Sequence, residues 1–262
     1  MKAGFLKVSC LIAGAMAMVA CGGNSGSGIF GEMPNIYREK IVEFALKGKS
    51  MAEDVKDCSH EEALAMLEEV REYVETVNEE IKTELTPHID ELKGTSIPCE
   101  VSDSVPYTLV GDMTITDVTL PKLKLTSSSK PLALHVEGAV VCNDTIYEYN
   151  EYFGKSVYML MSTSDGEYVK NMTTYAEHEG ERHFVIADAS WGGTYEKACL
   201  FPGDTLKMKF KIEEEDMPID IVNKCEKLHV VTKSVYDAEK KIIDDKKEAW
   251  EKLIAEELGM DE

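Results

Sequence analysis

The composition of this chain changes abruptly at Thr95, and this change constrains the fold more than any other feature. Residues 34–94 are rich in Glu, Ala and Leu, which favour helices, whereas residues 95–234 are rich in Val, Thr, Tyr and turn residues, which favour strands. Residues 235–262 return to a helical pattern. Because helices and strands occur in separate blocks and do not alternate, the sequence predicts an α+β fold.

A long helix is expected before the change. Ser59 and Glu62 have the spacing of a capping box, which marks a helix start. From there apolar residues recur at spacings of three and four, as in a coiled-coil seam. The seam residues are Ala63, Leu67, Val70, Val74, Val77, Ile81, Leu85, Ile89 and Leu92. We expect a helix over 59–93 that Pro87 kinks or restarts, preceded by a short amphipathic helix over 34–48.

Short strand patterns follow one another across residues 95–234, with no helical pattern between them. Asp165-Gly166 between two of them is a hairpin turn signal. The expected strands are Tyr107–Val110, Met113–Leu120, Leu123–Thr126, Leu132–Cys142, Val157–Ser162, Tyr168–Asn171, His183–Ala189, Thr205–Ile212 and Leu228–Lys233. Several short strands with frequent turns indicate an antiparallel β-sandwich.

The strand Leu132–Cys142 alternates between an apolar and a polar face. His135, Glu137 and Val141 point one way, and Gly138 lies on the packed face. The run LHVEGAVVCN resembles a strand pattern of immunoglobulin-like sandwiches in bacterial envelope lipoproteins. This resemblance implies a sandwich domain of unknown function.

Residues 236–258 predict a second long amphipathic helix. Glu and Lys alternate on its polar face, which supports a helix through pairs four residues apart. Its apolar stripe consists of Ile242, Ile243, Ala249, Trp250, Leu253, Ile254 and Leu258. The stripes of both long helices need cover, so we expect the two to pair as an antiparallel, coiled-coil-like stalk beside the sandwich.

Residues 1–20 have the pattern of an export signal. Lys2 and Lys7 give a positive start, and Val8–Val19 is an apolar run with the length of a signal-peptide core. This run is too short to span a bilayer, which needs about 20 apolar residues. Cys21 follows directly, after small and aliphatic residues.

The placement of Cys21 resembles the lipoprotein signal of Gram-negative bacteria. The resemblance implies cleavage before Cys21, acylation of its sulfur by fatty acids such as palmitate, and an outer-membrane anchor. Residues 21–33 would form the lipidated tether, because residues 22–28 contain only Gly, Ser and Asn. The first acidic residue after the cysteine is Glu32, and the lack of an earlier acidic patch favours a periplasm-facing protein, with surface exposure left open.

The formal net charge of −21 excludes some classes of partner. A chain this acidic lacks the basic stripe that nucleic acid requires, so no nucleic-acid partner is expected. Anionic lipid head groups should also repel it. The membrane contact that we expect is therefore the lipid anchor itself.

The cysteines leave the disulfide pattern open. Five remain after Cys10 in the signal and Cys21 at the anchor, and an odd number leaves one thiol over. The five are Cys58, Cys99, Cys142, Cys199 and Cys225. Their spacings are long, so they predict neither a redox pair nor a zinc site.

Chemistry-bearing motifs are weak throughout the chain. His178, Glu179 and His183 do not match the spacing of a helical zinc motif, so no metal site is expected. Trp191 and Tyr195 are a speculative stacking platform for a sugar or peptide. No GxSxG motif occurs, and the other histidines have no recognisable nucleophile partner. We expect no catalytic residue and no cofactor.

Three short segments have an Asp-Ser/Thr-aliphatic pattern. It resembles the O-glycosylation acceptor of some Gram-negative groups. The candidate acceptors are Ser104, Thr145 and Thr205. Ordinary turns and strands would produce the same pattern.

Three functional hypotheses follow. The favoured one is a non-catalytic envelope lipoprotein that binds a protein or glycan partner. The second is a periplasmic hydrolase or carbohydrate-active enzyme whose site is assembled only in the fold. The third is a subunit of an envelope or fimbria-like assembly, which would need an unpaired edge strand or an exposed helix stripe.

Overall fold

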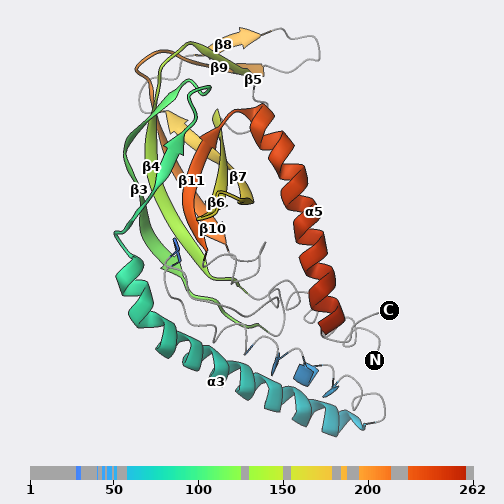
Figure 1. Cartoon of the computed structure of the whole chain (residues 1–262). Coiled ribbons are helices and arrows are strands. Elements are labelled where there is room, and N and C mark those ends of the chain that lie inside the picture. Colours follow the sequence, from blue (N-terminus) through green and yellow to red (C-terminus); the bar gives the residue numbers. More distant parts are fainter. Residues whose placement is uncertain are drawn as a thin grey trace.

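A computed structural model describes most of the strand-rich region and both long helices. The residues described are 28–30, 40, 43–44, 46–48, 50–51, 58–124, 130–149, 155–178, 184–187, 195–213 and 224–257. The described elements confirm the α+β class. Figure 1 shows a strongly curved sheet with one long helix across its lower end and another along its side.

Helix α3 (His60–Leu92) begins at the predicted capping box. The Ser59 hydroxyl accepts a hydrogen bond from the Glu62 amide at 3.3 Å, and the Glu62 carboxylate accepts one from the Ser59 amide at 2.7 Å. The C-terminal two thirds of the seam are buried, at Val74, Val77, Ile81, Leu85, Ile89 and Leu92. The helix runs through Pro87 without a restart.

The partner of α3 is a helical segment that precedes it in the chain. Residues 40, 43–44, 46–48 and 50–51 are helical. Lys40 forms an ion pair with Glu80 at 3.1 Å, and Lys47 forms one with Glu69 at 2.9 Å. Between them, the rings of Phe44 and Tyr73 stack with centroids 6.4 Å apart. Residue numbers rise on one helix as they fall on the other, so the two helices are antiparallel.

The main sheet has eight strands, in the order β1-β3-β4-β10-β7-β6-β11-β2. All neighbours are antiparallel except β2 and β11, which are parallel. The strands are β1 (Ser96–Ile97), β2 (Cys99–Val101), β3 (Tyr107–Thr119), β4 (Ala133–Cys142), β6 (Lys155–Thr163), β7 (Tyr168–His178), β10 (Thr205–Glu213) and β11 (Cys225–Val231). The edge strands β1 and β2 are separated only by Pro98. The sheet is therefore rolled, and residues 96–101 bridge its two edges.

The roll has two halves, which are joined by a short ladder between β10 and β7. β10 pairs with β4 over nine residues but with β7 only from Leu206 to Met208. One half consists of β3, β4 and β10, and the other of β7, β6 and β11. The ladders nevertheless join all eight strands into one sheet, so two separate facing sheets, as in a sandwich, are not confirmed.

The interior of the roll is packed with apolar side chains. Residues that are 1% exposed or less include Met113, Ile115, Leu134, Val136, Met159, Met161, Leu206, Met208, Ile212 and Leu228. Met113 lies at a bulge of β3 and covers Gly138, where an added Cβ would lie 2.1 Å from the Met113 sulfur. Gly138 thus lies on the packed face, as predicted. The hairpin turn at Gly166 is also confirmed, with a φ of 80°.

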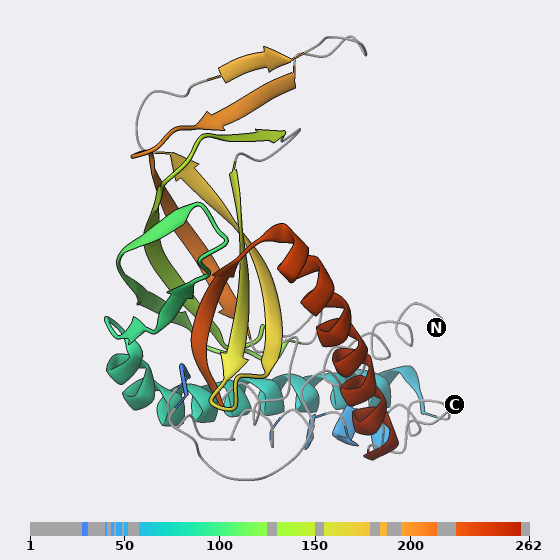
Figure 2. The ribbon, with the colours of Figure 1, turned by 45° about the horizontal axis from the view of Figure 1, so that its top comes forward.

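A second, three-stranded sheet stands at the other end of the roll from α3. Its order is β5-β9-β8, with β5 (Ile146–Tyr149), β9 (Tyr195–Leu200) and β8 (Phe184–Ala187) all antiparallel. Figure 2 shows this small sheet projecting beyond the end of the main sheet.

Helix α5 (Lys233–Glu257) covers the outer face of the main sheet at β6 and β7. Among the α5 side chains that the structure describes, Tyr236 and Ile243 are buried on this face, and they pack with Leu160 and Val231. A salt bridge between Lys246 and Glu167 ties the helix to the β6–β7 turn. The expected stalk of α3 with α5 is not confirmed, because within the described residues each helix finds its cover elsewhere.

The chain enters the roll at Ile29. Its amide donates a hydrogen bond of 2.5 Å to the carbonyl of Cys225, at the start of β11. Ile29 is 7% exposed and Phe30 is 1% exposed, and both belong to the same core as the sheet interior. Residues 28–30 are therefore fixed to the end of the roll that lies opposite the three-stranded sheet.

Candidate functional site

The structure describes the candidate residues from the sequence only in part. Cys21 and Trp191 lie outside the described residues, as do Glu179 and His183. The backbone of Tyr195 begins β9.

The three candidate glycosylation residues differ in their setting. Ser104 is exposed in the turn before β3, where its hydroxyl lies 2.9 Å from that of Ser102. Thr145 is exposed before β5, and its amide donates to the Asp144 side chain at 2.7 Å. Thr205 is half-buried and begins β10, paired with Val141. Exposure therefore favours Ser104 and Thr145 over Thr205 as acceptors.

The most site-like arrangement is one that sequence reasoning missed. Ser162 Oγ lies 2.8 Å from His229 Nε2, and His229 Nδ1 lies 3.6 Å from a carboxylate oxygen of Glu100. The three residues come from β6, β11 and β2, which are neighbours in the sheet. Glu100 is directly opposite His229 in the parallel ladder. The order serine, histidine, carboxylate is that of a hydrolase triad.

We call Ser162, His229 and Glu100 the polar row, and the surroundings of its two ionisable residues determine their charges at neutral pH. Burial lowers the pKa of His229 below its usual value of 6.5, and the nearby Lys227 adds to this while Glu100 opposes it. The hydrogen bond from Lys227 lowers the pKa of Glu100. At neutral pH the row therefore holds a neutral imidazole beside a charged carboxylate.

Whether these three residues can catalyse a reaction depends on the access of a substrate to the Ser162 hydroxyl. Ser162 is only 3% exposed, and the ring of Tyr168 stands edge-on to His229 at 5.3 Å. A nucleophile must be reached by its substrate, and this hydroxyl is covered. Lys227 holds Glu100 at 2.5 Å, so the carboxylate is shared between two partners. The geometry fits a buried polar pair that satisfies its own hydrogen bonds.

A second polar group lies inside the lower end of the roll. Lys170 is 6% exposed and donates a hydrogen bond to the carbonyl of Glu213, where β7 and β10 have separated. Burial raises the pKa of the Cys225 thiol to about 12, although Lys170 opposes the shift. Burial likewise raises the pKa of the Cys99 thiol to about 12. Neither thiol is activated as a nucleophile.

Among the described residues, no three His, Cys, Asp or Glu side chains come together as metal ligands would. No helix in the described part of the chain has the length and apolar character needed to cross a bilayer.

Comparisons with known proteins give no family for this chain. No protein family, curated protein or solved structure matches it.

Proposed function

We propose that this protein is a lipid-anchored envelope lipoprotein with a non-catalytic binding or structural role, facing the periplasm from the outer membrane. The observation that carries the proposal is the position of Cys21, directly after a stretch with the length and charge of a signal peptide. Two or more acyl chains at one cysteine are a stable anchor, whereas a single chain holds only marginally.

In this proposal, the entry of the chain into the roll at Ile29 determines which end of the fold lies near the membrane. Only seven residues separate Cys21 from Ile29, which is hydrogen-bonded to Cys225. At about 3.5 Å per residue, this stretch reaches at most about 28 Å. An anchor at Cys21 would hold the end of the roll that contains Ile29 close to the bilayer. The three-stranded sheet would then face away from the membrane.

The fold supplies the parts that a binding role needs. In this proposal the two halves of the rolled sheet are the sandwich-like body, and α3 with the helix at 40–51 is its helical arm. The three-stranded sheet, with β9 beginning at Tyr195, is the place for a glycan or protein partner. Exposed Ser104 and Thr145 are the proposed sites of O-glycosylation.

Replacement of the anchor cysteine tests the proposal. We expect Cys21→Ser to leave the chain unprocessed or to release it from the outer-membrane fraction, measured by fractionation and labelling with a palmitate analogue. Cys10→Ser is the matched control, because Cys10 lies within the signal and is not the acylation site. If Cys21→Ser still carries the label, the lipoprotein proposal is wrong.

A hydrolase is the second candidate function, and the row Ser162–His229–Glu100 favours it. Catalysis there would require a substrate to reach a hydroxyl that is 3% exposed. Purified protein should therefore show no turnover of peptide, ester or glycoside substrates. Turnover that Ser162→Ala abolishes, while the melting temperature is unchanged, would replace the non-catalytic proposal with an enzymatic one.

A further inference from the structure

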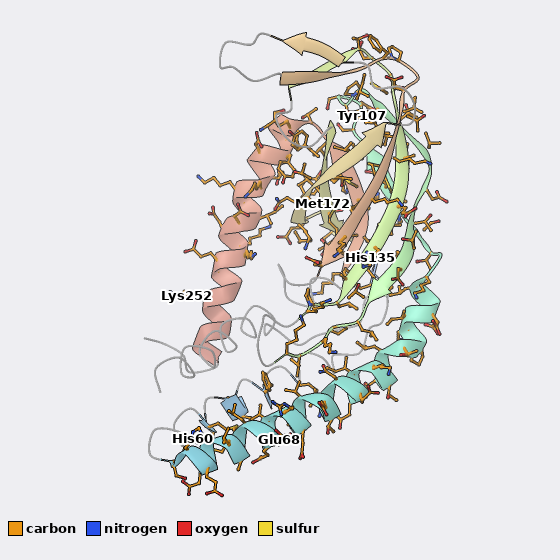
Figure 3. All side chains as sticks on the ribbon, turned by 180° about the vertical axis from the view of Figure 1, so that it is seen from behind. His60, Glu68, Tyr107, His135, Met172 and Lys252 are labelled. Carbon is orange, nitrogen blue, oxygen red and sulfur yellow. The ribbon has the colours of Figure 1, made fainter. Side chains whose placement is uncertain are left out.

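The first three turns of α3 carry an apolar stripe that the described residues leave uncovered. Leu64 is 53% exposed and Leu67 is 54% exposed, although Leu67 belongs to the same seam as the buried Val74. Ala63, Met66 and Val70 beside them are only half-buried. Figure 3 shows His60 and Glu68 on the end of α3 that lies far from the main sheet. The seam thus continues beyond the sheet that covers its other end.

The helical segment that precedes α3 contacts a different side of α3 from the one that carries Leu64 and Leu67. The helix at 40–51 contacts α3 through Glu69, Tyr73 and Glu80, which lie on another side of α3 from Leu64. Residues three, four and seven apart share one side of a helix, whereas Leu64 and Glu69 are five apart. Leu64 and Leu67 therefore form a stripe next to the covered seam and on the far side from the 40–51 helix.

The border of the stripe is strongly acidic. Residues 60–75 contain six glutamates and one arginine. The arginine, Arg71, is already ion-paired with Glu68 at 2.5 Å. Glu61, Glu68 and Glu75 follow one another at spacings of seven, on the side of Leu64. Any partner of this stripe must match leucines in its centre and carboxylates along its edge.

We propose that the stripe Leu64–Leu67, with its border of Glu61, Glu68 and Glu75, is a docking surface for a basic amphipathic helix of another protein. Apolar side chains of the partner would cover the two leucines, and its lysines or arginines would meet the glutamates. The same charge argues against two other occupants. A second copy would bring a second acidic border, and an anionic lipid surface would repel the helix.

This inference gives the binding role proposed above a surface and a partner chemistry, and it rests on that role but not on the lipid anchor. The test therefore uses residues 22–262, a chain that lacks the signal segment and the anchor cysteine. A failure of the docking test leaves the fractionation of Cys21→Ser as the separate measure of the anchor.

The probe is a synthetic helix of three heptads with leucine at the a and d positions and lysine at e and g. Its binding is followed by fluorescence anisotropy at about 0.15 M salt, where distant charges are screened. We expect the double variant Leu64→Ser/Leu67→Ser to weaken binding by about tenfold or more. Ile242→Ser is the matched control, because Ile242 on α5 is 48% exposed and lies outside the stripe. It should bind like the parent chain.

A charge reversal tests the acidic border separately. The double variant Glu61→Lys/Glu75→Lys should weaken binding of the lysine helix. It should also strengthen binding of a matched helix with glutamate at e and g. Circular dichroism confirms that each variant is folded, and this second variant keeps the test decisive if the leucine variant does not fold.

Four results would overturn the proposal. They are equal binding by the leucine variant, equal binding of the glutamate helix by the parent chain, self-association that the leucine variant abolishes in sedimentation, and vesicle binding that depends on the same leucines. The third result would assign the stripe to a second copy of the chain, and the fourth would assign it to a membrane.

Discussion

The two faces of the main sheet are held by different interactions. The inner face is covered by a large apolar cluster in which Met113, Leu134 and Ile212 are fully buried. Among the side chains that the structure describes, the cluster under α5 on the outer face has four buried apolar residues, Leu160, Val231, Tyr236 and Ile243. Polar contacts supplement them, since the Tyr236 hydroxyl accepts hydrogen bonds from Asn171 at 3.0 Å and from Thr173 at 3.2 Å.

This difference shows that the interior of the roll contributes most of the stability of the fold, whereas α5 contributes less. Apolar burial is the main stabilising contribution in the interior of the roll. On the outer face, hydrogen bonds and the ion pair between Lys246 and Glu167 position α5 but add only modest net stability. Local opening should therefore begin at α5, whereas the roll should unfold as a unit.

The largest expected effect comes from one substitution made on each face. Ile212→Ala in the roll should lower the free energy of unfolding by about 4 kcal/mol, and Ile243→Ala on α5 by about 2 kcal/mol. The reason is that Ile212 is 0% exposed within the large cluster of the roll, whereas Ile243 is 5% exposed within the smaller cluster under α5. Urea denaturation measures both. Equal losses would show that α5 is as tightly held as the interior.

An added methyl group tests the packing of the inner face. Gly138→Ala should cost about 1–3 kcal/mol, because its Cβ would collide with the Met113 sulfur and force that fully buried side chain to move. Gly203→Ala is a contrasting variant, since its Cβ would meet open space and only its backbone φ of 95° would be strained. A Gly138→Ala variant with the parent's stability would mean that the interior is loosely packed.

Loss of one hydroxyl tests the polar attachment of α5. Tyr236→Phe keeps the ring that packs against Tyr158 at 5.2 Å but removes the acceptor for Asn171 and Thr173. We expect a loss of about 1 kcal/mol. Hydrogen exchange should quicken in α5 and stay unchanged in the roll. Faster exchange in the roll as well would argue that both faces open together.

The smallest expected effect is a change in how the free energy of unfolding depends on pH, and it comes from His229 in the row Ser162–His229–Glu100 on the outer face. Because burial lowers the pKa of His229 below 6.5, the folded state binds fewer protons there than the unfolded state. The stability that the neutral His229 side chain contributes is fully present at pH values above 6.5, its usual pKa. This stability declines as the pH falls from there through the lowered pKa of the folded state. His229→Gln cannot titrate, so its free energy of unfolding should fall less steeply below about pH 6.5. Parallel pH curves for both proteins would contradict this.

The sequence predicted individual elements better than their partners. The capping box at Ser59 and the turn at Gly166 depend on residues close in sequence, and the structure confirms both. An amphipathic stripe shows that a helix has a buried side but not what covers it. For this reason the pairing of the two long helices was expected, whereas α3 packs with the segment just before it and α5 lies on the sheet.

The candidate site depends even more on the fold. Ser162 and His229 are 67 residues apart, and no local spacing connects them with Glu100. The sequence predicted the strand Val157–Ser162, and alternation along a strand puts Ser162 on the same face as Tyr158 and Leu160. The pairing of β11 with both β6 and β2 was not readable, because it depends on a rolled sheet.

The bridge at residues 96–101 has a consequence for the order of folding. β1 pairs with β3, which follows soon after it in the chain, but β2 pairs with β11 near the C-terminus. Such distant pairing is slow to form, since a long loop must close first. The sheet cannot close into a roll until β11 has been synthesised, because β11 connects β6 with β2. A chain that ends before Cys225 would present two unpaired strand edges and should aggregate.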